Sequence, residues 1–175
     1  MDFIFMVDDI SHMFITGPRM VKSVMGEDLS MEELGGAKIH SAVSGVADFR
    51  MSSEEECFQK IRRLLTFLPS SCDERLPAAE PSDDPERRDD EIADIVPTSP
   101  NKSYDIHDLI SRVVDNGDFL EVKEEFAREM VVGFGRLAGQ AVGIVANQPM
   151  VRAGALTIDS SDKQARFIRF CDCFN

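Results

Sequence analysis

The histidines and cysteines of this chain are the residues that could bind a metal ion or act as nucleophiles. His12, His40 and His107 lie far apart, and none has a cysteine or carboxylate at the spacing of a metal ligand. The cysteines are scattered as well and contain no Cys-x-x-Cys pair. We therefore expect no metal site, and we expect reduced thiols that pack as small apolar side chains. The cysteines are Cys57, Cys72, Cys171 and Cys173.

The sequence gives only weak evidence for a site that binds phosphate groups. The chain contains no Gly-x-Ser-x-Gly, Walker-type or dinucleotide-binding motif. Arg166 and Arg169 are three residues apart on a predicted helix, where they would form either a phosphate contact or an ordinary exposed face. Gly35 and Gly36 lie within another predicted helix, which they weaken by roughly 1 kcal/mol each relative to Ala. Two adjacent glycines within a helix require a structural explanation, for example the close approach of another backbone.

Composition limits the possible partners of the chain. Its 175 residues can bury one ordinary core, and its formal net charge is −13 with a pI near 4.6. Long-range repulsion therefore argues against nucleic acids and anionic membrane surfaces as partners. No apolar run reaches the length of about eighteen residues that a membrane-spanning helix needs, and the first residues lack the basic flank of a signal peptide. We expect no nucleic-acid binding and no membrane insertion.

Short strands and one helix are predicted at the start of the chain. Residues 3–7 and 13–16 are apolar runs separated by a polar stretch, which predicts two strands joined by a turn. Pro18 suits the first position of a helix that runs to about Met25, and Gly26 ends it.

Two further helices are predicted before residue 70. Ser30 followed by Glu33 is a capping box, which predicts a helix over residues 31–40. Ser53 precedes three glutamates, and apolar residues at helical spacing predict a helix over residues 53–68 that Pro69 closes.

The composition changes between about residues 70 and 102. Prolines stand there among acidic residues, with few large apolar side chains, and this predicts an extended connector on the surface between two folded parts. The prolines that carry this prediction are Pro77, Pro81, Pro85, Pro97 and Pro100.

A helix, a hairpin and a second helix are predicted after the connector. Asp105 is a helix cap for residues 106–114, and residues 119–122 form a short strand. Strands at residues 130–137 and 142–146 are joined at Ala138-Gly139, and their apolar residues predict burial on both faces. Asp159 or Ser160 then caps a helix to the last residue. Its apolar side is expected to contain Ala165, Ile168 and Cys171 or Asp172.

Several motifs resemble one enzyme family in order along the whole chain. The family is the carboxyltransferase subunit of biotin-dependent acyl-CoA carboxylases, especially the propionyl-CoA carboxylase beta type, with the related methylmalonyl-CoA decarboxylase alpha subunit. The matching segments are Phe14-Ile15-Thr16-Gly17-Pro18, Glu33-Leu34-Gly35-Gly36-Ala37, Ser44-Gly45-Val46-Ala47, Ile95-Val96-Pro97, Val131-Val132-Gly133-Phe134, Val142-Gly143-Ile144-Val145-Ala146-Asn147-Gln148-Pro149 and Ala165-Arg166-Phe167-Ile168-Arg169-Phe170-Cys171-Asp172.

The resemblance implies a mixed α/β fold of the crotonase (ClpP-like) type, a ββα superhelix present as two tandem copies in the full subunit. Residues 1–69 would be the end of the N-terminal copy and residues 103–175 the start of the C-terminal copy, with residues 70–102 as an acidic Pro-rich linker. The chain would then be an internal fragment of a longer subunit. The loops that supply the family's oxyanion-stabilising amides would lie outside it, so we expect no activity from the chain alone.

The implied reaction is transfer of a carboxyl group between carboxybiotin and the α carbon of an acyl-CoA, with propionyl-CoA or acetyl-CoA as the expected substrate. Biotin would be bound covalently to a carrier partner and not to this chain. The implied partners are the biotin carboxyl carrier and biotin carboxylase subunits, with further copies in a homohexamer. The expected compartment is the bacterial cytoplasm, with the mitochondrial matrix as alternative. Two other functions remain open, a non-catalytic remnant or interaction module and the carboxyltransferase subunit of a methylmalonyl-CoA decarboxylase.

By analogy with the crotonase repeat, the loop over residues 147–155 is the candidate site. Gly154 and Ala155 are candidate backbone donors for catalysis, or else residues of a simple strand-to-helix turn. Asn147 and Gln148 would hydrogen-bond either biotin or the turn itself.

Two other positions complete the predicted site. Gly35 and Gly36 would face substrate or allow tight packing of a helix. The family usually has His after Ser-Gly-Val-Ala, whereas this chain has Asp48, and this departure leaves the role of the position open.

Overall fold

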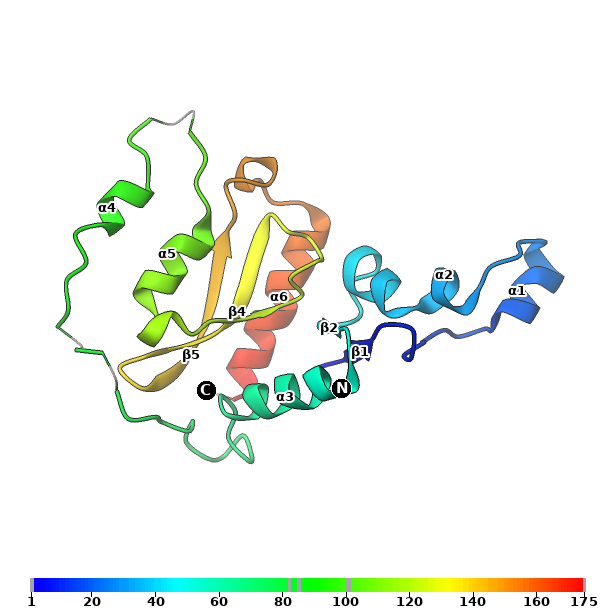
Figure 1. Ribbon diagram of the computed structural model, residues 1–175, viewed down its shortest axis with the longest axis horizontal. Helices are drawn as coiled ribbons and strands as arrows, with labels where there is room; N and C mark the ends of the chain where they lie inside the picture. Colours follow the sequence, from blue (N-terminus) through cyan, green and yellow to red (C-terminus); the bar gives the residue numbers. More distant parts are fainter. Residues whose placement is uncertain (1, 82, 85, 100–101, 175) are drawn as a thin grey trace. The chain divides into compact units, whose positions relative to one another are not determined.

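The computed structural model describes residues 2–81, 83–84, 86–99 and 102–174 (Figure 1). The chain divides into two compact units. Unit 1 consists of residues 1–61 and Lys123–Phe126, and unit 2 consists of the remaining residues 62–122 and 127–175. Pro85 and Pro100, two prolines of the predicted connector, lie outside the described residues, as do Met1 and Asn175. Among the described residues, no helix is sufficiently long and apolar to cross a bilayer.

Unit 1 contains a two-stranded parallel sheet and a series of helices. Strand β1 (Phe5–Val7) pairs with β2 (Phe49–Met51), and the rings of Phe5 and Phe49 stack with centroids 4.7 Å apart. The helices are α1 (Pro18–Met25), α2 (Met31–Gly35), the π-helix η1 (Ile39–Val43) and α3 (Glu54–Leu65), which extends past residue 61. A small core contains Met6, Ala37 and Ala47, against which Ile4 and Met13 pack.

Two predictions for unit 1 are wrong. Residues 13–16 form no strand, because a single bridge between His12 and Gly36 is the only ladder contact there among the described residues, and Ile15 is fully exposed. The helix predicted over residues 31–40 ends at Gly35, where the chain turns to the extended conformation of Gly36. The capping box of Ser30 and the helix Pro18–Met25 with its Gly26 cap are confirmed.

A short segment from later in the chain completes unit 1. The backbone N–H of Lys123 donates to the Asp48 carbonyl at 2.9 Å. The ring of Phe126 lies so close to Gly45 that an added Cβ would come within 2.6 Å of it. Glu125 accepts hydrogen bonds from the Arg50 guanidinium at 3.1 Å. The core of unit 1 therefore depends on residues that are distant in sequence.

Unit 2 is a three-stranded antiparallel sheet with a helix on each face. The strand order is β3 (Leu120–Val122), β4 (Met130–Leu137), β5 (Gln140–Asn147). Helix α5 (Ile106–Val113) packs on Val131 and its neighbours, and α6 (Ile158–Cys173) packs through Phe167 on Phe134, whose side chain points to the opposite face (Figure 1). The short helices α4 (Ile92–Ile95), η2 (Asp115–Gly117) and η3 (Arg152–Gly154) complete the unit.

The predicted two-residue hairpin turn is confirmed. Leu137 pairs with Gln140, and Ala138 and Gly139 have φ values of 50° and 78°, as a tight turn between twisted strands requires. The Asp115 carboxylate accepts both turn amides, at 3.0 and 2.7 Å.

Burial differs between the two strands of the hairpin. Strand β4 is buried on both faces over its first six residues, as predicted, whereas β5 alternates between buried and exposed positions, so the prediction for β5 is wrong. Within the described part of the chain, β4 is the one strand that pairs with β5, and the opposite edge of β5 has only an isolated bridge between Gln140 and Ala78, which leaves that edge largely uncovered.

Helix α6 differs from the prediction at its start and in its buried face. Its cap is Thr157, whose hydroxyl accepts from the Ser160 amide in a capping box, and not Asp159 or Ser160 itself. The buried residues are Ser160, Lys163 and Phe167, whereas Ile168 is half exposed. The apolar side expected around Ala165 and Ile168 is therefore wrong, because the Phe167 ring and the hydrogen-bonded polar residues determine which face is buried. The helix ends at Cys173.

The connector contacts α5 through ion pairs and caps. Arg87 donates to the Val113 carbonyl at 3.1 Å, at the C-terminal end of α5. Arg112 on α5 binds Asp89 at 2.9 Å and Glu91 at 2.7 Å. Asp89 and Glu91 of this segment therefore share one specific cationic partner, and most of the described residues of the segment are exposed, as expected for a segment on the surface.

Candidate functional site

The loop after β5 carries the predicted catalytic residues, and its backbone is already hydrogen-bonded. The Gly154 amide donates to the Val151 carbonyl at 2.9 Å, and the Ala155 amide donates to the Arg152 carbonyl at 3.1 Å. The Asn147 side-chain amide donates to the Gly154 carbonyl at 2.6 Å. The donor role of Gly154 and Ala155 stays a prediction, and it requires these internal bonds to be exchanged for bonds to a ligand.

Three successive residues of this loop have left-handed backbone conformations. The φ values are 50° at Arg152, 55° at Ala153 and 70° at Gly154. Glycine adopts this region freely, whereas an L-residue with a Cβ loses about 1–2 kcal/mol there. The turn is therefore strained at Arg152 and Ala153.

Glu129 fixes both ends of the loop. Its carbonyl accepts from the Gln148 amide at 2.8 Å, and its carboxylate accepts from the Thr157 hydroxyl at 2.5 Å. Burial would raise the pKa of the Glu129 carboxyl, but the Thr157 hydrogen bond and the positive charges of Arg152 and Lys163 outweigh burial and lower it. Glu129 is therefore held as an anion at the base of the loop.

The side chain of Gln148 is buried and hydrogen-bonds to other residues of the protein. Its side chain is nearly inaccessible, its Oε1 accepts from the Ile106 amide at 3.3 Å, and its Nε2 donates to Asp105 at 2.7 Å. These contacts connect the end of β5 to the start of α5. The bond from Asn147 to Gly154 and the bond from the Met150 amide to Gln148 Oε1, at 3.3 Å, match the alternative in which both residues hydrogen-bond the turn. The biotin-binding role of both residues stays a prediction.

A histidine cluster next to Gln148 was not recognised in the sequence. His107 Nδ1 lies 2.7 Å from an Asp105 oxygen, and Nε2 lies 2.7 Å from a Glu121 oxygen. Asp105 is only two residues away, and its role as a helix cap was predicted, but Glu121 comes from β3, and only the packing of α5 on the sheet brings it close. Among the described residues, no group of three or more His, Cys, Asp or Glu side chains is arranged so that it could hold a metal ion, and this includes Asp105, His107 and Glu121.

The cluster predicts a pH-dependent contribution to stability. Burial would lower the pKa of His107, but hydrogen bonds to Glu121 and Asp105 outweigh burial and raise it above its usual 6.5. Burial would raise the pKa of Asp105, but hydrogen bonds from Gln148 and His107 outweigh burial and lower it below 3.8. The His107 contribution is thus complete below pH 6.5 and is lost as pH rises through its folded pKa. The Asp105 contribution is complete above pH 3.8 and is lost as pH falls through its folded pKa.

We expect His107→Gln to lower the melting temperature by a few degrees at about pH 5 and by progressively less toward about pH 9. The effect is modest because the His107 side chain is 42% exposed and water screens its charge. Melting curves of both proteins across this range measure the difference, and a difference that does not change with pH would contradict the prediction.

Gly35 and Gly36 belong to unit 1, whereas residues 147–155 belong to unit 2. A Cβ at Gly35 would lie 2.2 Å from the Met13 carbonyl oxygen, so this glycine permits the close approach of another backbone. The Met13 amide also donates to the Gly35 carbonyl at 2.8 Å. The packing alternative is thus observed at Gly35, and the substrate-binding role of the pair stays a prediction.

Asp48, which departs from the family pattern, forms a buried ion pair. Its Oδ1 lies 3.0 Å from Lys123 Nζ, and the side chains are 2% and 5% exposed. Its Oδ2 accepts from the Ile4 amide at 2.7 Å, and Lys123 Nζ also donates to the Gly45 carbonyl. The residue therefore has a structural role in this chain.

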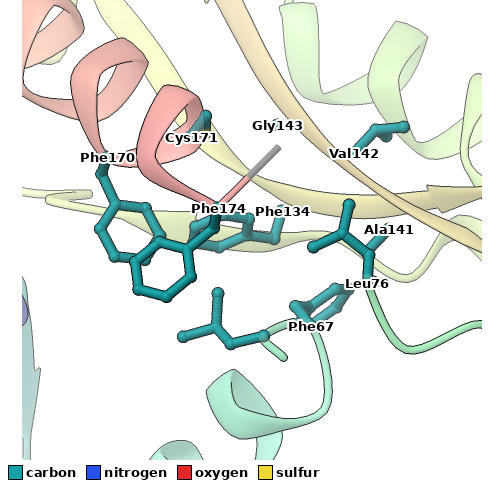
Figure 2. A pocket seen from close by; sticks show the side chains of 10 residues that line it. Phe67, Leu76, Phe134, Ala141, Val142, Gly143, Phe170, Cys171 and Phe174 are labelled. Carbon is teal, nitrogen blue, oxygen red and sulfur yellow. The ribbon is translucent and has the colours of Figure 1, made fainter. Parts of the chain in front are cut away.

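An apolar cavity of about 320 Å³ lies in unit 2 between the end of α6, the hairpin and the segment after α3. Figure 2 shows the rings of Phe170 and Phe174 gathered beside Phe134, with Phe67 and Leu76 on the other side. Burial raises the pKa of the Cys171 thiol at its wall, which disfavours the nucleophilic thiolate. None of the described residues that line the cavity has a charged side chain.

Comparison with known proteins identifies the family. The profile of the carboxyl transferase domain matches residues 1–175, and the chain belongs to this family. It is 57% identical over 174 residues to the propionyl-CoA carboxylase carboxyltransferase subunit of Haloferax mediterranei. It is 50% identical over 174 residues to the methylmalonyl-CoA decarboxylase subunit alpha of Veillonella parvula. Each match covers 99% of this chain and 34% of the relative, so the chain spans about a third of the length of these curated relatives.

A solved structure confirms the fold. The transcarboxylase 12S structure, a hexamer with methylmalonyl-coenzyme A and methylmalonic acid bound, superposes with a TM-score of 0.96 at 46% identity. The match covers 99% of this chain and 34% of that chain. The mixed α/β, crotonase-like carboxyltransferase fold expected from the motifs is therefore confirmed.

Proposed function

We propose that this chain is part of an acyl-CoA carboxyltransferase that exchanges a carboxyl group between carboxybiotin and the α carbon of an acyl-CoA, with propionyl-CoA or acetyl-CoA as substrate. The observation that carries the proposal is the 57% identity to a propionyl-CoA carboxylase carboxyltransferase subunit over 99% of the chain. The TM-score of 0.96 to transcarboxylase 12S also supports it. The relatives include decarboxylase subunits, which would run the same half-reaction in the opposite direction.

The chain would contribute to two crotonase-like copies, with residues 1–69 in the first, residues 103–175 in the second and residues 70–102 as their linker. The hairpin of β4 and β5 followed by α6 supports the second copy, because it supplies the ββα unit of that fold. Residues 1–61 of the helix-rich unit 1 would belong to the end of the first copy, whereas its segment Lys123–Phe126 would come from the second copy.

In this reaction a proton leaves the acyl α carbon, which then accepts the carboxyl group, and negative charge develops on the thioester oxygen. Backbone amides stabilise such oxyanions well when they are fixed before the reaction. We propose Gly154 and Ala155 as such donors and Asn147 and Gln148 as residues on the biotin side, once the internal bonds of the loop are exchanged. Gly35 and Gly36 would lie on the substrate side.

Biotin would arrive on a carrier subunit loaded by a biotin carboxylase, and the assembly would be a homohexamer in the bacterial cytoplasm. Transcarboxylase 12S, which is described as a hexamer within a multienzyme core, supports an oligomer of this kind.

A chimera tests the proposal. The chain replaces the matching third of the Haloferax mediterranei subunit, and the product is assayed with its partner subunits for methylmalonyl-CoA formation from propionyl-CoA. We expect turnover within about ten-fold of the parent, because 57% identity preserves the backbone on which the site depends. Sedimentation and melting curves of chimera and parent serve as controls. A chimera that folds and assembles like the parent but transfers no carboxyl group would refute the proposed function.

A further inference from the structure

The imidazole of His107 lies between two carboxylates from different parts of unit 2. Its Nδ1 is 2.7 Å from Oδ1 of Asp105, which caps α5, and its Nε2 is 2.7 Å from Oε2 of Glu121 on β3. Gln148, directly after β5, places its side-chain nitrogen 3.2 Å from the same Nδ1. The two carboxylates are the titratable groups whose hydrogen bonds and charges act on the ring, and Gln148 is uncharged. The ring therefore joins α5, β3 and the end of β5.

The two short contacts of the ring require a proton on each of its nitrogens. A neutral imidazole has one N–H and one bare nitrogen, whereas the imidazolium donates from both. Both nitrogens lie 2.7 Å from a carboxylate oxygen, so a bare nitrogen would direct its lone pair at a lone pair of that oxygen. The observed geometry is thus that of the cation, and deprotonation of the ring must break one of the two contacts.

The contacts around the ring indicate that Nδ1 loses its proton first. Asp105 keeps two other donors, the His107 backbone amide at 2.9 Å and the Gln148 side-chain amide at 2.7 Å, and its side chain is 40% exposed. The Glu121 side chain is only 13% exposed, so loss of its N–H donor costs more. The Gln148 nitrogen is also close enough to donate to a bare Nδ1. The neutral ring therefore keeps its proton on Nε2.

We propose that His107 is a pH-dependent switch between β5 and α5: the cation donates from Nδ1 to Asp105, whereas the neutral ring accepts at Nδ1 from the Gln148 side chain. Gln148 transmits the change, because its Oε1 accepts from the Ile106 amide at the start of α5 and from the Met150 amide in the loop after β5, both at 3.3 Å. Rising pH thus draws Gln148 toward the ring and changes the bonds that position this loop. The inference goes beyond the proposed function, because all these contacts lie within unit 2 and none involves the reaction.

An NMR titration of the chain from about pH 5 to about pH 9 tests the switch, because this range contains the usual charge change of histidine. The ring nitrogens of His107 report its protonation and its tautomer. The Gln148 side-chain amide and the Met150 backbone amide report the connection. We expect all these signals to share one midpoint, with the proton of the neutral ring on Nε2. Constant Gln148 and Met150 signals while His107 titrates would overturn the proposal, as would a neutral ring protonated on Nδ1.

Glu121→Gln distinguishes a switch from a ring that only fills space. Loss of the Glu121 charge removes support for the cation, so the midpoints of His107 and Gln148 should move together to lower pH. Glu91→Gln is the matched control in the same unit, because Glu91 is 73% exposed and pairs with Arg112 instead, and both midpoints should stay in place. In His107→Gln the Gln148 transition should disappear. A Gln148 transition that persists without His107, or that stays in place in Glu121→Gln while the His107 midpoint moves, would overturn the proposal.

Discussion

Replacement of Lys123 by Met is expected to destabilise unit 1 by about 3–5 kcal/mol, because it leaves the Asp48 carboxylate buried without its cation. The two side chains are 5% and 2% exposed, and Nζ lies 3.0 Å from Oδ1. Water cannot solvate the remaining charge at such burial, so the substitution costs more than the attraction of the pair alone. A loss of this size is comparable to the whole stability of a small unit.

A double variant shows whether the lost stability comes from the unpaired buried charge of Asp48 or from the loss of the lysine side chain. Asp48→Asn/Lys123→Met removes both charges of the buried pair. In the wild type the Ile4 amide donates to Asp48 Oδ2 at 2.7 Å, and the side-chain oxygen of the Asn can still accept this bond. We expect the double variant to recover most of the lost stability. Lys22→Met is the control, because Lys22 and its partner Asp28 are 60% and 76% exposed, and it should change stability by less than about 0.5 kcal/mol.

Urea titrations followed by NMR signals of Ala47 and Phe49 report unfolding of unit 1, because both residues are buried there. If Lys123→Met lowers the unfolding free energy no more than Lys22→Met, the buried pair does not stabilise the unit as described. If the double variant is as unstable as the single one, the loss comes from packing of the lysine stem instead of from the unpaired charge.

Local signals in the sequence predicted most of the elements. Pro18 and Gly26 bound α1, Ser30 with Glu33 starts α2, and Ala138-Gly139 forms the hairpin turn. Each of these features depends on residues within a few positions of one another, so its physical cause is visible in one sequence. The fold class was predicted from the motifs that resemble the carboxyltransferase family, because local signals for single helices and turns do not define how the elements pack.

Predictions failed where the outcome depends on a distant segment. The helix expected to continue through Gly35 ends there, and the Gly35 carbonyl accepts from the amide of the distant Met13 at 2.8 Å. The structural role of Asp48 depends on its ion pair with Lys123, which is distant in sequence but lies in the same unit. The second carboxylate that contacts His107 belongs to Glu121 on β3, which is also distant in sequence.

The candidate site was predicted in part. The sequence located the loop from Asn147 to Ala155, and the structure shows a compact turn there, but neither its strain nor its anchoring by Glu129 had a sequence signal. Left-handed residues without glycine, such as Arg152 and Ala153, cannot be recognised from residue type, because the surrounding contacts impose the conformation.

Truncation of Phe134 to Ala is expected to destabilise unit 2 by about 3–5 kcal/mol, because the ring is the centre of its aromatic cluster. Phe134 is 5% exposed, and its ring centroid lies 5.0 Å from that of Phe167 and 5.9 Å from that of Phe67. It also borders the cavity of about 320 Å³, so the lost ring would enlarge a void that its neighbours already leave unfilled (Figure 2).

Two variants calibrate the Phe134 measurement, which is a urea titration followed by NMR signals of unit 2. Ile168→Ala truncates a large apolar side chain of α6, in the same unit, that is 52% exposed, and it should cost less than about 1 kcal/mol. Phe134→Leu keeps much of the apolar volume and should lose roughly half as much stability as Phe134→Ala. If Phe134→Ala costs no more than Ile168→Ala, the sheet and α6 are held together without the aromatic cluster. The packing of α6 would then depend on its buried polar residues, Ser160 and Lys163, which are 0% and 2% exposed.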